Sequence, residues 1–223
     1  MWCIPPKANA AFACAMEDVL ETYTRPADPQ RPLICMDETN KQLLSEPLAP
    51  QPPQPGRVAR EDFHYEREGV ANLFMFFAPL LGQRWVKVTE QRTASVWAET
   101  MREVADTLYP QAEKIVVVLD NLNTHSPASF YQAFPPVEAR RLVERFEFHF
   151  TPKHGSWLNI AEIELSVLIR QCLAGRIPSP EVLAQQIEAW QTERNARNVK
   201  VHWHFTTQDA RVKLKNLYPR YDP

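Results

Sequence analysis

The stretch that decides the fold is KIVVVLD, residues 114–120. An unbroken apolar run rich in valine is typical of a strand buried on both faces, as in the middle of a parallel sheet. A second apolar run, LICMD at residues 33–37, is long enough for another buried strand and also ends in aspartate. Both runs therefore predict strands that place an acidic side chain where the strand ends.

Further strands and helices are predicted on either side of these two runs. Strands are expected at residues 64–67, 71–79, 85–89 and 146–150, with turns at Gly69 and Gly82. Helices are expected at residues 8–23, 93–108, 127–146 with an interruption at Pro135-Pro136, 156–174, 180–198 and 208–217. This order of elements predicts an α/β fold with a mixed central sheet flanked by helices.

Length and composition exclude several classes of protein. The 223 residues, 44% of them hydrophobic, are enough for a sizeable core. Only 5 glycines are present and they stand far apart, so the chain lacks the glycine-rich phosphate loop of simple NTPases and dinucleotide enzymes. Proline is abundant instead, and the Pro-rich residues 46–60 predict an extended loop, for which recognition by a Pro-binding module is the weaker alternative.

The cysteines and the N-terminal sequence bear on location. Cys3, Cys14, Cys35 and Cys172 form no C-x-x-C pair and stand mostly in apolar surroundings, as small buried thiols do. The N-terminus does not resemble an export signal, and no stretch approaches the roughly 18 apolar residues that a membrane span needs. A cytoplasmic protein without a membrane segment is therefore expected.

The net charge of −2 hides a gradient along the chain. Residues 1–139 carry 12 basic and 18 acidic side chains, a net charge of −6, whereas residues 140–223 carry 13 and 9, a net charge of +4. A solvated helical surface explains such a basic run, and a nucleic-acid contact is the alternative.

Two aspartates and one glutamate form a candidate acidic site. Asp37 and Asp120 follow apolar strands, and on neighbouring strands of an α/β sheet they would face one another at the reactive crevice. Carboxylate oxygens so placed are typical ligands of Mg²⁺, although each Asp alone has the alternative of starting a turn. A third acid is expected on the helix at 156–174, where Glu162 and Glu164 flank the apolar stripe and the periodicity does not choose between them.

Three ordered blocks carry a resemblance to a known family. They are LICMDET at 33–39, VLDNLNTH at 118–125 and HGSWLNIAE at 154–162, with a further block at 198–211. These blocks resemble those of bacterial insertion-sequence transposases related to mariner, which are DDE superfamily endonucleases with an RNase H-like fold. The resemblance covers nearly the whole chain. Ile160 stands where the family has proline, which leaves the register intact.

The resemblance implies a catalytic triad of Asp37, Asp120 and Glu162, separated by 120 − 37 = 83 and 162 − 120 = 42 positions. Two Mg²⁺ or Mn²⁺ ions are implied as cofactors, with Asp37 bridging them and Glu164 as a minor alternative ligand. The implied reactions are hydrolysis of a phosphodiester and transfer of the freed 3′-hydroxyl to another phosphodiester, both of them in-line displacements.

The same resemblance implies duplex DNA as the partner, both transposon ends and target, and a homodimer in the synaptic complex, associated with the nucleoid. Possible DNA or phosphate contacts are His125, His154, Trp157, Asn159, Lys200 and Arg211. Three of them have a purely structural alternative: His125 as a helix cap, Trp157 as a packing residue, and Asn159 with Glu162 as a capping box. His202 and His204 are expected on one face of a partly exposed strand, with a zinc site as the weaker alternative.

The predicted domain organisation is a connector at residues 1–30 followed by a catalytic domain at 31–223. The helix-turn-helix modules that precede the catalytic domain in this family have no counterpart in the sequence, which predicts a truncated transposase. The alternative is a non-catalytic truncated transposase that binds DNA or the full-length enzyme and interferes with transposition. A nuclease acting on RNA–DNA hybrids is disfavoured by the HGSWLN block.

Overall fold

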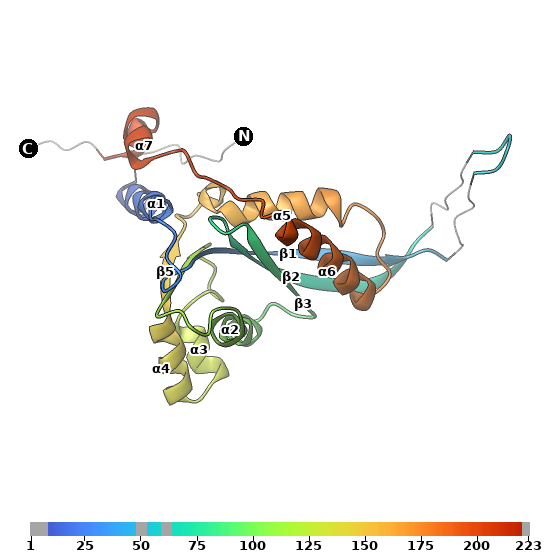
Figure 1. Ribbon diagram of the computed structural model, residues 1–223, viewed down its shortest axis with the longest axis horizontal. Helices are drawn as coiled ribbons and strands as arrows, with labels where there is room; N and C mark the ends of the chain where they lie inside the picture. Colours follow the sequence, from blue (N-terminus) through green and yellow to red (C-terminus); the bar gives the residue numbers. More distant parts are fainter. Residues whose placement is uncertain (1–8, 48–52, 59–63, 220–223) are drawn as a thin grey trace, which may run out of the picture.

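A five-stranded mixed sheet separates two layers of helices in the computed structural model, which describes residues 9–47, 53–58 and 64–219 (Figure 1). The strands are β1 (Leu33–Ser45), β2 (Glu66–Ala78), β3 (Gln83–Thr89), β4 (Ile115–Leu119) and β5 (Phe146–Phe150), in the order β3-β2-β1-β4-β5. The pairs β1/β2 and β2/β3 are antiparallel, whereas β4 is parallel to both β1 and β5. The predicted mixed α/β sheet flanked by helices is confirmed.

The helices divide between the two faces of the sheet (Figure 1). One layer contains α1 (Ala10–Tyr23), α5 (Ile160–Gln171) and α6 (Pro180–Ala196), with α7 (Thr207–Lys213) packed on α1. The other layer contains α2 (Ala94–Glu103), α3 (Ala128–Ala133) and α4 (Pro136–Arg145). Short helical turns lie at Val104–Leu108, Ser156–Leu158 and Lys215–Leu217. Within the described residues, no helix is long and apolar enough to cross a membrane.

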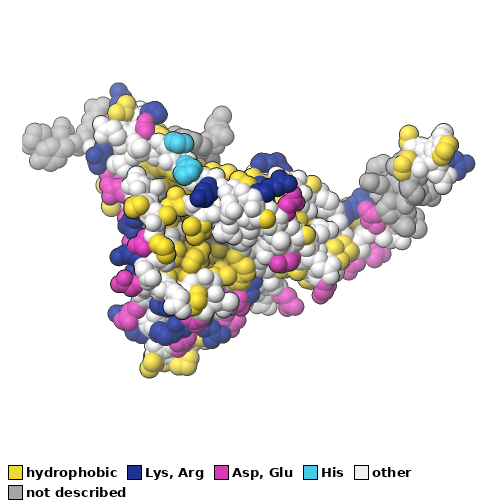
Figure 2. Space-filling view, in the orientation of Figure 1, with side chains coloured by type: hydrophobic (Ala, Val, Ile, Leu, Met, Phe, Trp, Pro, Cys, Tyr) yellow, Lys and Arg dark blue, Asp and Glu magenta, His cyan; other side chains and the backbone are white. Residues whose placement is uncertain are grey.

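Side-chain alternation in the central strands divides the core into two. Successive side chains of a strand point to opposite faces. Cys35 and Val118 therefore join the core under α1, α5 and α6, while Ile34 and Val117 join the core over α2, α3 and α4. All of β4 is buried, which explains its unbroken apolar sequence. Figure 2 shows the charged side chains on the outer surfaces and apolar side chains in the recess between the two layers.

Two strands are longer than their sequence pattern predicts. β1 continues beyond Asp37 to Ser45, and β2 is one strand instead of two short ones. The polar part of β1 is held by backbone pairing with β2, which does not depend on apolar side chains. Gly69 is not at a turn: it lies within β2 at φ +105°, where the β1/β2 register shifts between Leu43 and Leu44, as at a bulge.

The hairpin formed by β1 and β2 extends away from the helical layers (Figure 1). The described part of the predicted loop at 46–60 is residues 46–47 and 53–58, and the rest of that prediction lies outside the described residues. Gln54 and Arg57 form a bridged turn with Gly56 at φ +82°.

The helix α1 is built into the core that it shares with α5 and α6, here called the first core, although it lies within the predicted connector. Phe12, Met16 and Leu20 are buried there. Its N-cap residue Asn9 donates its backbone N–H to the carbonyl of Leu217 at 2.9 Å, which ties the start of α1 to the turn at Lys215–Leu217. The boundary at residue 30 stays a prediction, but α1 packs as part of the same body.

The cysteines of the described ranges are free thiols. Cys35 is buried and Cys172 is partly buried, as expected. The same expectation is wrong for Cys14, which lies on an exposed position of α1, and Cys3 lies outside the described residues.

The turn between β2 and β3 is pressed against the segment that follows α6. Val201 donates its N–H to the carbonyl of Pro79 at 3.1 Å, and the Gln83 amide donates to Asn198 Oδ1 at 2.8 Å. Gly82 adopts φ +67° there, and a Cβ atom added to it would lie 2.6 Å from the carbonyl carbon of Asn198. The position therefore excludes a side chain by backbone conformation and by space.

We expect Gly82→Ala to lower the free energy of unfolding by about 2 kcal/mol or more, because left-handed strain and a backbone clash add together. Chemical denaturation measures the change. Gly175→Ala, where a Cβ meets no atom within 4 Å, is the control and should leave stability unchanged. Equal stability of the two variants would contradict the close packing of this turn.

Candidate active site

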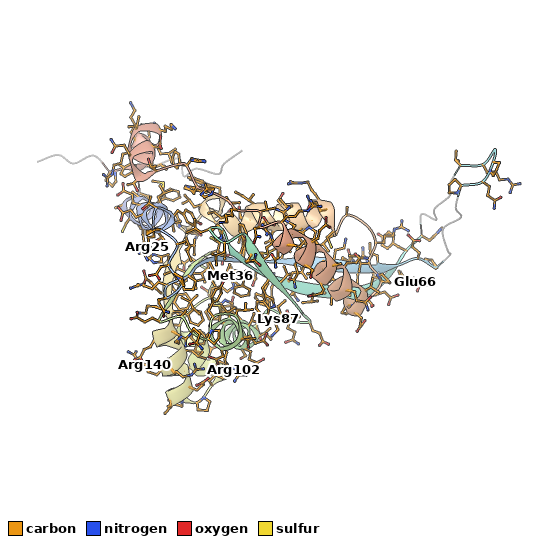
Figure 3. All side chains as sticks on the ribbon, in the orientation of Figure 1. Arg25, Met36, Glu66, Lys87, Arg102 and Arg140 are labelled. Atoms are coloured by element: carbon orange, nitrogen blue, oxygen red, sulfur yellow. The ribbon has the colours of Figure 1, made fainter. Side chains whose placement is uncertain are left out.

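Asp37 lies in the middle of β1, at the centre of the sheet. Figure 3 labels the preceding residue, Met36, between the two helical layers. Asp37 alternates with Met36 and therefore shares the face of Cys35, which α1 and α5 cover. Its Oδ1 accepts the backbone N–H of Glu38 at 2.8 Å. Asp37 is thus held inside a strand, not at the strand end that the sequence predicts.

Asp120 follows the last residue of β4, as predicted. The parallel register pairs Cys35 with Val118. Continued by two residues, this register brings Asp37 beside Asp120. The expectation that the two aspartates occupy neighbouring strands is therefore met, because one aspartate is internal to its strand and the other ends the adjacent strand.

Glu162 reaches the same region from the first turn of α5, which packs on β1 and β2. Its charge and that of Asp120 both act on Asp37. The pKa of Asp37 is raised to about 7: burial is the largest cause and the negative charges of Asp120 and Glu162 add to it, while the N–H of Glu38 and the nearby His125 oppose it. The three carboxyl groups therefore share one electrostatic environment, although they come from three separate elements.

This donor set fits a hard divalent cation in its chemistry. Carboxylate oxygens are the ligands that Mg²⁺ and Mn²⁺ prefer. Among the described residues, however, no three His, Cys, Asp or Glu side chains lie close enough together to hold an ion as they stand. Like charges repel until a cation neutralises them, so binding an ion requires the three side chains to close in.

Glu164, the alternative third acid, has a different role. It is buried and accepts from Arg84 Nε at 2.6 Å and from Arg194 Nε at 2.7 Å. The side chains of Arg84 and Glu164 are 0% and 2% exposed. A buried carboxylate paired with two guanidinium groups is neutralised and fixed. This network joins β3, α5 and α6, and it leaves Glu162 as the acid that faces Asp37.

His125 is a buried link between two carboxylates. Its Nδ1 lies 2.5 Å from Asp120 Oδ1 and its Nε2 lies 3.2 Å from Glu38 Oε2, while its ring stacks on Trp97. Burial alone would lower the pKa of His125, but Asp120 and Glu38 outweigh it and raise the pKa to about 9. Neither the predicted DNA contact nor the helix cap describes this residue, since it is enclosed by its two acids.

Glu38, which follows Asp37 in β1, is a further residue of the site. Its side chain does point to the opposite face from Asp37, as strand alternation predicts, and therefore it is not placed as a metal ligand. It nevertheless reaches Asp120 through His125, and Arg92 donates to its Oε1 at 3.2 Å. The sequence signal was the pair of adjacent acids at 37–38 together with a histidine soon after Asp120.

A cavity of about 610 Å³ adjoins Asp120. The loops after β4 and β5 line it, and the residues include Asn123, Lys153, His154 and Ser156. His154 is exposed and has φ +66°. The cavity has room and polar groups for a phosphate beside the acids, and a DNA contact by His154 stays a prediction.

The contact predicted for Asn159 is wrong. This residue is fully buried; its Nδ2 donates to the carbonyl of Met36 at 2.8 Å, and its Oδ1 accepts the N–H of Ala161 at 3.1 Å. It caps α5 and fastens the helix to β1. Trp157 is partly buried with its ring edge-on to Phe205, which agrees with the packing alternative.

Four of the basic side chains after residue 190 form ion pairs within the chain. The pairs are Arg194 with Glu164, Arg197 with Glu193, Arg211 with Glu17, and Lys213 with Asp209. A DNA contact by Arg211 would require loss of its bidentate pair, so the structure gives it the role of joining α7 to α1. Lys200 is exposed and has no ion pair in the described part of the chain, so its predicted contact remains open.

The strand expected around His202 and His204 is wrong. The segment between α6 and α7 is extended but pairs with no strand of the described chain. Its alternation is real: Val201, Trp203 and Phe205 pack on the first core, and the two histidines are exposed. In this segment every second residue is apolar and packs inward, although no neighbouring strand holds it.

Known proteins similar to this chain agree on one fold. A family model described as DDE superfamily endonuclease matches residues 32–183. The Mos1 mariner paired end complex with Mn matches at TM-score 0.61 and 15% identity, over 98% of this chain and 66% of that chain. The Mos1 transposase paired-end complex with left transposon end matches at TM-score 0.60 and 15% identity, with coverage of 98% and 66%.

The Mos1 paired end complex with Mg matches at TM-score 0.57 and 14% identity, over 99% of this chain and 66% of that chain. The chain thus spans just under two thirds of the length of these solved chains. A search of curated proteins gave no match. The similarity confirms the predicted RNase H-like fold.

We expect Asp37→Asn to stabilise the metal-free protein at pH 8 by about 1–4 kcal/mol, and to change it little at pH 4. The folded state binds a proton at Asp37 up to about pH 7, whereas the unfolded state releases it near 3.8. The contribution of Asp37 to the free energy of unfolding is therefore present at low pH and is lost as pH rises from about 4 through 7. Each unit of difference between the folded and unfolded pKa corresponds to about 1.4 kcal/mol.

Urea denaturation in EDTA across this pH range measures the difference between the two proteins. Glu188→Gln, an exposed change on α6, is the control. A wild-type-minus-variant difference that stays flat with pH would contradict the raised pKa of Asp37 in the folded protein.

Proposed function

The chain belongs to the DDE superfamily endonucleases, and from this premise we propose that it is the catalytic domain of a transposase that cleaves DNA and transfers the cut strand. The observation that carries the proposal is the convergence of Asp37, Asp120 and Glu162 on one environment, where the other two charges raise the pKa of Asp37. Repulsion of this kind favours cation binding.

The proposed chemistry needs no covalent bond to the protein. When bound, Mg²⁺ or Mn²⁺ supplies activation of the attacking oxygen and charge stabilisation of the leaving oxygen at phosphorus. Asp37 would bridge two ions, Asp120 would hold one and Glu162 the other. His125 orients Asp120 by its hydrogen bond, and Glu38 holds the other ring nitrogen of His125, in the way that outer partners orient metal ligands elsewhere.

The proposed partners are duplex DNA and a second copy of the chain. The similar Mos1 structures are paired-end complexes, one of them with the left transposon end. We propose the ends of an insertion sequence as substrate, acted on in the cytoplasm at the nucleoid. The cavity beside Asp120, with Lys153 and His154 at its edge, supports a phosphate-backbone contact there.

We expect Asp120→Asn and Glu162→Gln each to reduce metal-dependent cleavage by about 100-fold or more. Even the outer partners of metal ligands cost 10- to 100-fold, so loss of a ligand carboxylate should cost at least as much. The measurement is cleavage and strand transfer of a labelled duplex carrying the ends of the element, in Mg²⁺ or Mn²⁺.

Glu188→Gln serves as the control, because it removes the same charge far from the acids. Activity that survives Asp120→Asn or Glu162→Gln would overturn the triad. A folded wild-type chain that binds the duplex but never cleaves it would overturn the catalytic proposal in favour of an interfering transposase fragment.

A further inference from the structure

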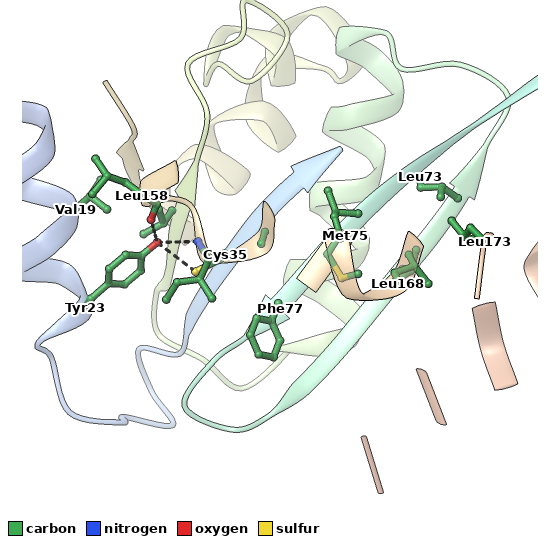
Figure 4. Close-up of a cluster of buried hydrophobic side chains, with 14 of the residues drawn as sticks. Val19, Tyr23, Cys35, Leu73, Met75, Phe77, Leu158, Leu168 and Leu173 are labelled. Atoms are coloured by element: carbon green, nitrogen blue, oxygen red, sulfur yellow. Dashed lines mark hydrogen bonds between the residues drawn. The ribbon is translucent and has the colours of Figure 1, made fainter. Parts of the chain in front are cut away.

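The hydroxyl group of Tyr23, at the end of α1, sits between the start of α5 and β1, two of the three elements that provide the proposed catalytic acids (Figure 4). It donates to the carbonyl of Leu158 at 2.7 Å and accepts the N–H of Ile160 at 3.3 Å. The thiol of Cys35 donates to it at 3.7 Å. A phenol has one donor and two acceptor sites, so these three bonds use its full capacity.

On the α5 side, Tyr23 completes the start of the helix that bears Glu162. The first N–H groups of a helix have no partner inside the helix. In α5 the N–H of Ala161 goes to the Asn159 side chain and that of Glu162 to the Asn159 carbonyl. The N–H of Ile160 goes to Tyr23. Tyr23 is therefore a cap supplied from a different helix.

On the β1 side, the same hydroxyl contacts Cys35, two residues before Asp37. Asn159 adds a second link, because its Nδ2 donates to the carbonyl of Met36 at 2.8 Å. The start of α5 is thus joined to the strand of Asp37 at two adjacent positions. Neither link involves a catalytic carboxylate itself.

The environment of Tyr23 keeps the hydroxyl in this role. The side chain is buried, and its ring packs against Trp203 with centroids 5.3 Å apart. Burial raises the pKa of Tyr23 well above its usual value, and the neighbouring Cys35 adds to this. The hydroxyl therefore keeps its proton and donates throughout the ordinary pH range.

We propose that Tyr23 is a positioning residue of the active site: its hydroxyl, together with Asn159, sets the placement of Glu162 relative to Asp37. This inference rests on the proposed function of the three acids. It makes α1 part of the catalytic apparatus, although α1 carries none of the acids and precedes the matched family region at 32–183.

The test compares Tyr23→Phe with Tyr218→Phe in the full chain. Tyr218 also holds α1 by its hydroxyl, which donates to Glu17 Oε1 at 2.8 Å. This bond links α1 to neither α5 nor β1. Each change removes one hydroxyl and leaves the ring. Mn²⁺ affinity is measured by electron paramagnetic resonance titration, and DNA cleavage by single-turnover kinetics, both well below the melting temperature of every variant.

We expect Tyr23→Phe to weaken Mn²⁺ binding about fivefold and to slow cleavage at saturating DNA about tenfold or more, with the KM for DNA unchanged, because small displacements of ligands cost large factors in rate. Tyr218→Phe should match the wild type in both. A purely structural role would lower the melting temperature in Tyr23→Phe without moving the Mn²⁺ affinity or the rate of the folded protein, and that result overturns the proposal.

A second variant covers the case in which Tyr23→Phe does not fold. Asn159→Ser keeps an N-cap oxygen for α5 but removes the donor to Met36. Unchanged Mn²⁺ affinity in this variant overturns the proposal, and weakened affinity supports it. If the wild-type chain binds Mn²⁺ but cleaves no DNA, the proposed function fails, while the difference in Mn²⁺ affinity still decides whether Tyr23 positions the acids.

Discussion

The parallel pairing of β1 with β4 is the constraint on which the rest of the structure depends. It sets Asp37, inside β1, beside Asp120, which directly follows β4, so that burial and the neighbouring carboxylate both disfavour the charged form of Asp37. The surrounding elements place partner groups around these two side chains. His125, whose other nitrogen is bonded to Glu38, holds Asp120 from one face, and α5 brings Glu162 from the other. The two helical layers thus have separate electrostatic tasks as well as separate cores.

Local sequence patterns predict much of this architecture. The valine-rich run before Asp120 predicts a doubly buried strand because only apolar side chains suit both cores, and the Pro135-Pro136 break separates α3 from α4 as expected. The aspartates were found from the same pattern. What local pattern does not contain is pairing: β1 runs past Asp37 only because β2 offers it a partner, and apolar periodicity ends where that pairing continues.

The site shows the same division between local and tertiary information. Glu162 and Glu164 are equivalent on a helical wheel, and they differ only because Arg84 and Arg194, distant in sequence, neutralise one of them. Asn159 and His125 look like DNA contacts as polar residues of a motif, yet burial turns both inward. Partners that come from far along the chain decide which polar residues face the substrate.

The register shift at Gly69 has a mechanical meaning. From Cys35 to Leu43 the ladder between β1 and β2 is continuous, and beyond it the pairing resumes out of step. A bulge is the softest point of a two-stranded ribbon, since one residue there lacks its ladder partner. A force on the outer hairpin is therefore expected to bend the ribbon at Gly69, about 20 Å along the strand from Asp37 at roughly 3.3 Å per residue. Strain in the outer hairpin is therefore expected to be taken up at this bulge before it reaches Asp37.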